Sequence, residues 1–116
     1  MLYAVEMDGR CIFYGTDTDA LPEAVWQAFG RLKLRFDLVV LDHTYGHQGK
    51  QGSDHMSASQ VIEHFARMRR EALLAPNART FATHIAHDAN PAHPELVELA
   101  RGHGYEIGYD GLTLEL

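Results

Sequence analysis

The feature of this sequence that most constrains its fold is a series of strand-like segments that each end in histidine or aspartate. The clearest is the segment 79–83, a buried-strand pattern that continues directly into His84 and, three residues later, His87. Similar endings occur elsewhere: residues 11–16 lead to Asp17, residues 36–41 lead to Asp42, and the polar loop 46–53 leads to Asp54 and His55. Because a strand end holds side chains in a well-defined position, we expect these polar residues to form one site at one edge of a sheet.

Composition narrows the classes of function. The 116 residues suit one domain spanning 1–116, and 46% of them are hydrophobic, which is enough for a sizeable core. The formal charge of -6 argues against a nucleic acid as a partner. The single cysteine, Cys11, excludes a disulfide framework, so we expect a cytoplasmic protein. No apolar run is long enough to predict a membrane span.

Turn signals and periodicity predict an α/β fold with a mixed sheet and about three helices. Asp8-Gly9 and Asp110-Gly111 each separate two strand-like runs, which predicts a β-hairpin at either end of the chain. Between the hairpins, three helices are predicted: one at about 20–32, one that starts at Ser57 and is ended by Pro76-Asn77, and one at 94–102. Strands are predicted at 34–41 and 80–84. This alternation of strands and helices is typical of layered α/β domains.

Asp17 and His84 are the strongest candidates for metal ligands. A carboxylate and an imidazole, each at or just past a strand end, suit zinc, manganese or iron. The sequence leaves a simpler interpretation equally open, in which Asp17 caps a turn and His84 is a hydrogen-bonded histidine at the sheet edge. No compact ligand motif such as H-E-x-x-H is present to decide between the two.

His55 and Asp42 are candidates for catalytic roles. Imidazole titrates near neutral pH, so His55 is suited to act as a general acid or base. Asp42 is suited to orient a histidine or a metal-bound water. In the alternative interpretation, His55 is a polar residue ahead of a helix and Asp42 ends a strand in an ordinary turn. Other histidines are weaker candidates, because His64 and His103 fall in predicted helices and the rest lie in or beside loops.

Five short motifs occur in the order found in a known family. They are Tyr14-Gly-Thr-Asp17-Thr, Val39-Val-Leu-Asp42, Asp54-His55, Thr83-His84-Ile-Ala-His87 and Gly108-Tyr-Asp-Gly-Leu112. On these motifs, which span nearly the whole chain, the sequence resembles the C-terminal half of a metallo-β-lactamase-fold hydrolase. Within that superfamily it is most similar to the cyclic phosphodiesterases of phosphonate breakdown, and more distantly to the tRNA 3′-end processing ribonucleases.

This resemblance implies half of an αββα sandwich and a role for each matching residue. Asp17 matches the aspartate that bridges two metal ions, and His84 matches the last histidine ligand. His55 matches a histidine near the scissile phosphate, a candidate proton donor to the leaving group, and Asp42 matches the acid that ends the preceding strand. In such enzymes zinc or manganese activates the attacking water and stabilises the charge that develops on phosphorus.

The chain departs from the family in one respect. The signature H-x-H-x-D-H and the middle histidine ligand, which belong to the family's N-terminal half, are absent from it. We therefore expect a half-domain that hydrolyses a small phosphodiester when a partner N-terminal half or a second copy completes the site. The apolar face that such a half exposes predicts a homo-oligomer. The alternatives are a non-catalytic, self-associating half-domain and a single-metal binding module built on Asp17, His84 and His87.

Overall fold

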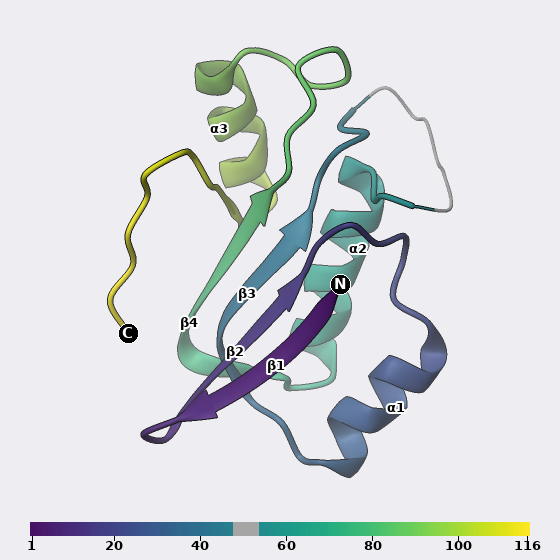
Figure 1. The fold of residues 1–116 in the computed structure, drawn as a ribbon, viewed down its shortest axis with the longest axis vertical. Coiled ribbons are helices and arrows are strands. Elements are labelled where there is room, and N and C mark those ends of the chain that lie inside the picture. Colours follow the sequence, from purple (N-terminus) through teal and green to yellow (C-terminus); the bar gives the residue numbers. More distant parts are fainter. Residues whose placement is uncertain (48–53) are drawn as a thin grey trace.

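The computed structural model describes residues 1–47 and 54–116, so the predicted loop 46–53 lies largely outside the described residues. The described residues form five strands and three helices, which confirms the predicted α/β class with a mixed sheet (Figure 1). In chain order the elements are β1 (Leu2–Met7), β2 (Arg10–Gly15), α1 (Glu23–Arg31), β3 (Phe36–Asp42), α2 (Ala58–Arg70), β4 (Leu74–Thr83), α3 (His93–Gly102) and β5 (Glu106–Ile107). None of the described helices is long and apolar enough to cross a membrane.

The strands lie in the sheet in their chain order, β1-β2-β3-β4-β5. The first pair is an antiparallel hairpin around Asp8-Gly9, as predicted, and both turn residues have positive φ. All other neighbouring strands are parallel, and a helix connects each parallel pair. As a result, the carboxyl ends of β2, β3 and β4 lie at one edge of the sheet, where Gly15 pairs with Leu41 and Leu41 pairs with Ala82.

One face of the sheet carries the hydrophobic core. Alternate strand residues such as Phe13 and Val39 are buried there against residues from all three helices. The helices contribute Trp26 and Phe29 from α1, Val61, Phe65 and Met68 from α2, and Leu96 and Ala100 from α3. The rings of Phe13 and Phe29 meet edge to face, with centroids 5.1 Å apart. Burial of one such side chain stabilises the fold by about 1.5–3 kcal/mol, so this core fixes the strands that present the polar edge.

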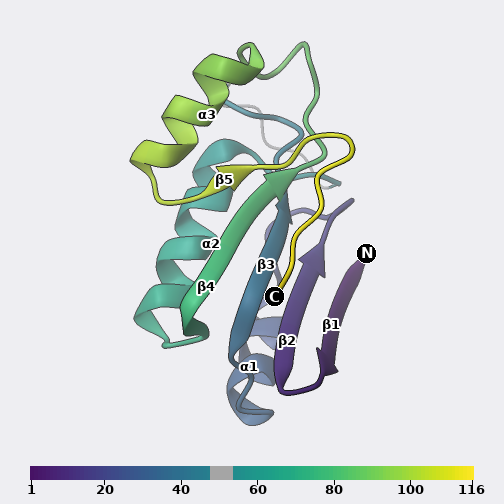
Figure 2. The same ribbon diagram turned by 90° about the vertical axis from the view of Figure 1, so that its left-hand side faces the viewer.

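The other face of the sheet is covered only in part. The C-terminal segment 112–116 lies over it without pairing as a strand (Figure 2). The predicted second hairpin is therefore wrong: β5 has two residues, pairs in parallel with β4, and has no antiparallel partner among the described residues. The turn at Asp110-Gly111 does form, but Leu112 and Leu114 then pack beside Phe81 on this apolar face instead of extending the sheet.

The second helix ends earlier than predicted. Its start is confirmed, because Ser57 and Gln60 form the reciprocal hydrogen bonds of a capping box. Its last residue is Arg70, and Ala72 adopts a φ of 56° that turns the chain into β4. Pro76 lies inside β4, within an irregular stretch where the ladder with β3 is interrupted, so its missing N–H disturbs no pairing.

Candidate metal centre

Four side chains from four separate parts of the chain meet at the carboxyl edge of the sheet. Asp17 follows β2, Asp42 ends β3, His55 precedes α2, and His84 follows β4. One possible ligand atom from each of the four lies within 4.8 Å of the others. The structure therefore brings together all four of the residues that the sequence singled out.

Asp42 is the buried centre of this cluster. Its side chain is fully buried, and its two oxygens accept four hydrogen bonds. Oδ2 accepts from the backbone N–H of Asp17 at 2.8 Å and pairs with Nδ1 of His55 at 2.9 Å. Oδ1 accepts from the backbone N–H and the hydroxyl of Thr44, at 2.9 and 2.7 Å. With both oxygens engaged, Asp42 orients its neighbours from behind the site.

His55 is held in a defined orientation by Asp42. Because a carboxylate accepts only, Nδ1 of His55 carries a proton and Nε2 points away from Asp42. The hydrogen bond to Asp42 raises the pKa of His55, and the nearby charges of Asp42 and Asp54 act in the same direction. The imidazole ring also stacks on that of His84, with centroids 5.0 Å apart.

His84 is oriented by Thr44, a residue that sequence reasoning did not single out. Oγ1 of Thr44 lies 2.7 Å from Nδ1 of His84 and 2.7 Å from Oδ1 of Asp42. The hydroxyl has one proton, and the carboxylate is its strongest acceptor, so Nδ1 of His84 donates to Thr44. Nε2 is then the ring nitrogen of His84 that faces Asp17. Such support of a histidine by a hydrogen-bonded partner is common behind metal ligands.

The backbone at Asp17 and His84 is strained. Both residues have a positive φ, 52° and 60°, which residues other than glycine seldom adopt. Each such residue costs of order 1 kcal/mol or more, and such costs concentrate at functional sites. His84 comes directly after β4, and Asp17 comes two residues after the end of β2, so in both cases the chain turns away while the side chain stays at the sheet edge.

The donor atoms of Asp17 and His84 fit a metal ion. Oδ1 of Asp17 and Nε2 of His84 are 3.1 Å apart, and their side chains are 56% and 43% exposed. Two ligands on one ion at about 2.1 Å in tetrahedral geometry lie about 3.4 Å apart, so little movement is needed. Oxygen and imidazole nitrogen together suit zinc and manganese. The Asp/His cluster can therefore bind a divalent ion.

Comparisons with known proteins do not identify the chain. Its sequence matches no protein-family model and shows no significant similarity to any curated protein. The metallo-β-lactamase resemblance therefore continues to rest on the five motifs and their order.

The other candidate histidines lie apart from the cluster. His87 is not among the described residues that form it, so a module built on Asp17, His84 and His87 is not the arrangement seen. His43 is fully buried between Asn90 and Tyr105, with 2.9 Å to each partner. Burial lowers the pKa of His43 to about 4, so this histidine is neutral at pH 7.

Asn90 holds together the loops that follow β3 and β4. Its amide nitrogen donates to the carbonyl oxygens of His43, Thr44 and Ala86, which follow β3 and β4. Its side-chain oxygen faces Nδ1 of His43, which therefore carries the proton, while Nε2 accepts from the hydroxyl of Tyr105. The only sequence signal for this role is the turn-forming pair Asn90-Pro91.

Proposed function

We propose that this chain carries part of the active site of a metal-dependent hydrolase that acts on phosphodiesters. One observation carries the proposal: at the ends of three parallel strands, the carboxylate of Asp17 and the imidazoles of His55 and His84 surround the buried Asp42. The substrate class rests on the motif resemblance, in which the matching residues surround the scissile phosphate. A reducing compartment such as the cytoplasm suits the buried free thiol of Cys11.

Asp17 and His84 are the proposed ligands of zinc or manganese. A bound divalent ion would polarise the phosphate and lower the pKa of a bound water. The strained backbone at both residues and the support of His84 by Thr44 place the two donor atoms before any ion arrives. Such preorganisation reduces the free-energy cost of assembling the site.

His55 is the proposed proton donor to the leaving oxygen. Its raised pKa increases the fraction of imidazolium near neutral pH, which is the form that can give up a proton. Asp42 holds Nδ1, so the proton leaves from Nε2 and the ring remains hydrogen-bonded as neutral imidazole. Asp42 thus positions the donor without itself exchanging a proton.

Metal titration tests the ligand assignment. Calorimetry with Zn²⁺ and Mn²⁺ should show binding to the wild-type chain, and His84→Ala and Asp17→Asn should each weaken it at least about 10-fold. His87→Ala is the matched control, because it removes an exposed histidine from the same loop but outside the cluster. Absence of binding to the wild type, or equal binding to His84→Ala, would contradict the assignment.

A typical catalytic zinc has three protein ligands, one more than Asp17 and His84 supply. We therefore propose that a second copy or a partner N-terminal half completes the site. Hydrolysis of bis(p-nitrophenyl) phosphate with zinc or manganese should then rise more steeply than protein concentration, or appear when a partner half is added. Rates at background under all of these conditions would count against a hydrolase.

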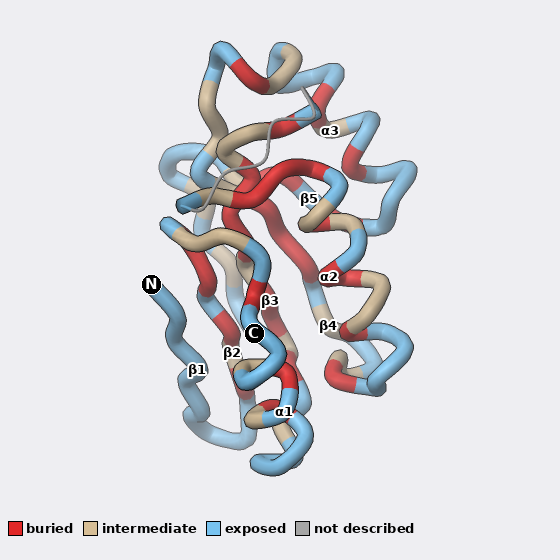
Figure 3. The backbone as a smooth tube through the Cα atoms, turned by 90° about the vertical axis from the view of Figure 1, so that its right-hand side faces the viewer, coloured by how far each residue is buried: buried red, intermediate tan, exposed pale blue. Residues whose placement is uncertain are grey.

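A second candidate function is self-association without catalysis. On the face of the sheet opposite the helices, β1 exposes Tyr3 by 55%, Val5 by 49% and Met7 by 69%, and the whole strand is exposed (Figure 3). Tyr3 and Val5 pair with Tyr14 and Ile12 on β2, so their side chains continue one apolar surface. Sedimentation velocity should show a dimer that Val5→Lys weakens, whereas Leu99→Lys on α3 leaves it intact. A wild-type monomer at high concentration would exclude this candidate.

A further inference from the structure

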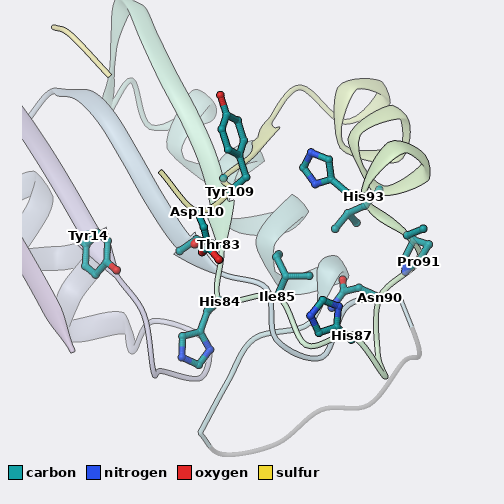
Figure 4. Close-up of a pocket in the computed structure, with 13 residues that line it drawn as sticks. Tyr14, Thr83, His84, Ile85, His87, Asn90, Pro91, His93, Tyr109 and Asp110 are labelled. Carbon is teal, nitrogen blue, oxygen red and sulfur yellow. The ribbon is translucent and has the colours of Figure 1, made fainter. Parts of the chain in front are cut away.

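A cavity opens directly beside His84. It has a volume of about 720 Å³ and lies between the end of β4, the start of α3 and the turn after β5 (Figure 4). In that view His84 and His87 lie on one side of the cavity, and His93 and Tyr109 lie on the other. Cavities of this size accommodate small organic molecules. Because His84 belongs both to the cavity and to the metal cluster, a ligand in the cavity would contact the cluster.

The walls of the cavity suit a planar ring. Tyr14 and Tyr109 both line it, and these residues are 39% and 60% exposed, so their surfaces are accessible to a ligand. The rings of Tyr109 and His93 meet edge to face at 6.2 Å, which orients Tyr109. Ile85 and Leu96 add apolar surface. Aromatic side chains bind flat ligands with little loss of conformational entropy, because few of their bonds rotate.

The charge of the cavity argues against a second phosphate group. Of the described residues that line it, none is a lysine or an arginine, and Asp110 adds a carboxylate. Asp17 and Asp42 lie beside it in the cluster. A further anionic group in the cavity would face these carboxylates without a lysine or an arginine among the described residues of its walls.

We infer that the cavity binds an uncharged planar ring carried by the ester group of the substrate, so that the preferred substrates are ring-bearing phosphodiesters with a single negative charge. This inference rests on the proposed function, since it places the phosphate at the Asp17–His84 pair. Tyr109 and Tyr14 are then specificity-determining residues, and Asp110 disfavours substrates with a second charge.

Ligand titration followed by NMR tests this inference without requiring turnover. The full chain is titrated, with and without zinc in the solution, with bis(p-nitrophenyl) phosphate and with dimethyl phosphate, which has the same charge and no ring. We expect the first to bind at least about 10-fold more tightly, a preference of about 1.4 kcal/mol, and to shift the backbone amides of Gly108 and Tyr109. Equal affinity for the two diesters, or shifts confined to residues outside the cavity, would overturn the inference.

Two variants, each with a matched control, test whether Tyr109 causes the ring preference and whether Asp110 disfavours a second charge. Tyr109→Ala should reduce the ring preference, whereas Tyr3→Ala, at a similarly exposed tyrosine outside the lining, should not. Asp110→Asn should strengthen binding of the dianion p-nitrophenyl phosphate about 3-fold, whereas Asp8→Asn, which also precedes a glycine in a turn, should not change it. Unchanged affinities in Tyr109→Ala and Asp110→Asn would also overturn the inference.

Failure of this inference and failure of the proposed function give different results. Zinc binding that depends on His84, without any preference for the ring-bearing diester, contradicts only the assignment of the cavity. Ring preference that depends on Tyr109, in a chain that binds neither zinc nor manganese, contradicts only the metal-dependent hydrolase.

Discussion

The buried carboxylate of Asp42 accepts a hydrogen bond from the backbone N–H of Asp17, 2.8 Å away. The bond joins the end of β3 to the second residue after β2, at the point where the chain turns with a positive φ. The same carboxylate oxygen pairs with His55. One acid therefore fixes both a proposed metal ligand and a proposed proton donor, and the two cannot shift independently.

Asp42→Asn should damage the site more than the fold. An amide presents an NH₂ group to at least one of the four donors that now face the carboxylate, so we expect a loss of about 1–3 kcal/mol of stability. Because the neighbours of Asp42 lose their orientation, zinc affinity should fall about 10- to 100-fold. Urea unfolding and zinc titration measure the two effects.

Asp37→Asn is the matched control for this prediction. Asp37 accepts from the backbone N–H of Cys11 at 2.9 Å, between the same two strands but at their opposite end. We expect a smaller stability change and no change in zinc affinity. Equal zinc affinities in both variants would contradict the positioning role of Asp42.

The strain at His84 predicts that glycine is more stable than alanine at this position, the reverse of the usual order inside a strand. His84→Gly should be more stable than His84→Ala by about 1 kcal/mol, because glycine adopts a φ of 60° without steric cost. At Thr83, which is in β4, alanine should instead be more stable than glycine by about 0.5–1 kcal/mol. Thermal or urea unfolding of the four variants checks this, and alanine being the more stable at both positions would show that His84 is not strained.

Gly46→Ala should be strongly destabilising. A Cβ at Gly46 would lie 2.3 Å from the carbonyl oxygen of Ala89 and 2.3 Å from the side-chain oxygen of Asn90, and φ is 52°. The control is Gly9→Ala in the first hairpin, where φ is 77° but no atom lies within 4 Å of the added Cβ. We expect about 1–2 kcal/mol at Gly9 from the backbone alone, and at least about 3 kcal/mol at Gly46. Similar losses at both positions would mean that the contact with Asn90 is loose.

His64 should make stability depend on pH. Burial lowers the pKa of His64 from 6.5 to about 4, and its Nε2 accepts the N–H of Leu21 at 2.9 Å. Between those two pH values the unfolded chain binds a proton that the folded chain does not, so stability is complete above pH 6.5 and falls as the pH drops toward 4. The shift corresponds to a loss on the order of 3 kcal/mol.

Unfolding in urea from pH 7 to pH 4.5 measures this dependence. His64→Gln keeps an acceptor for Leu21 but cannot titrate. The slope of the free energy of unfolding against pH should therefore fall by the amount that corresponds to about one bound proton. The remaining slope includes His43, whose pKa is lowered in the same direction. An unchanged slope in the variant would mean that His64 is protonated in the folded state.

Much of the candidate site was predictable from the sequence. Parallel strands joined by helices place their carboxyl ends at one edge, so Asp17, Asp42 and His84 were expected at the same edge once β2, β3 and β4 were identified. Thr44 and Asn90 were not predictable in the same way. Thr44 meets His84 across 40 residues and Asn90 meets His43 across 47, and no local pattern encodes either contact.

The sequence by itself determined the order of strands and helices as far as β5, the first hairpin and the polar ends of the strands, because turn chemistry and apolar periodicity act over a few residues. The tertiary structure decided the rest. Only the packed sheet buries Asp42 among four donors, and only there does its carboxylate orient His55 and the Asp17 turn. At the C-terminus the local signal for a hairpin was overridden, because Leu112 and Leu114 pack on an apolar sheet face that strands distant in the sequence create.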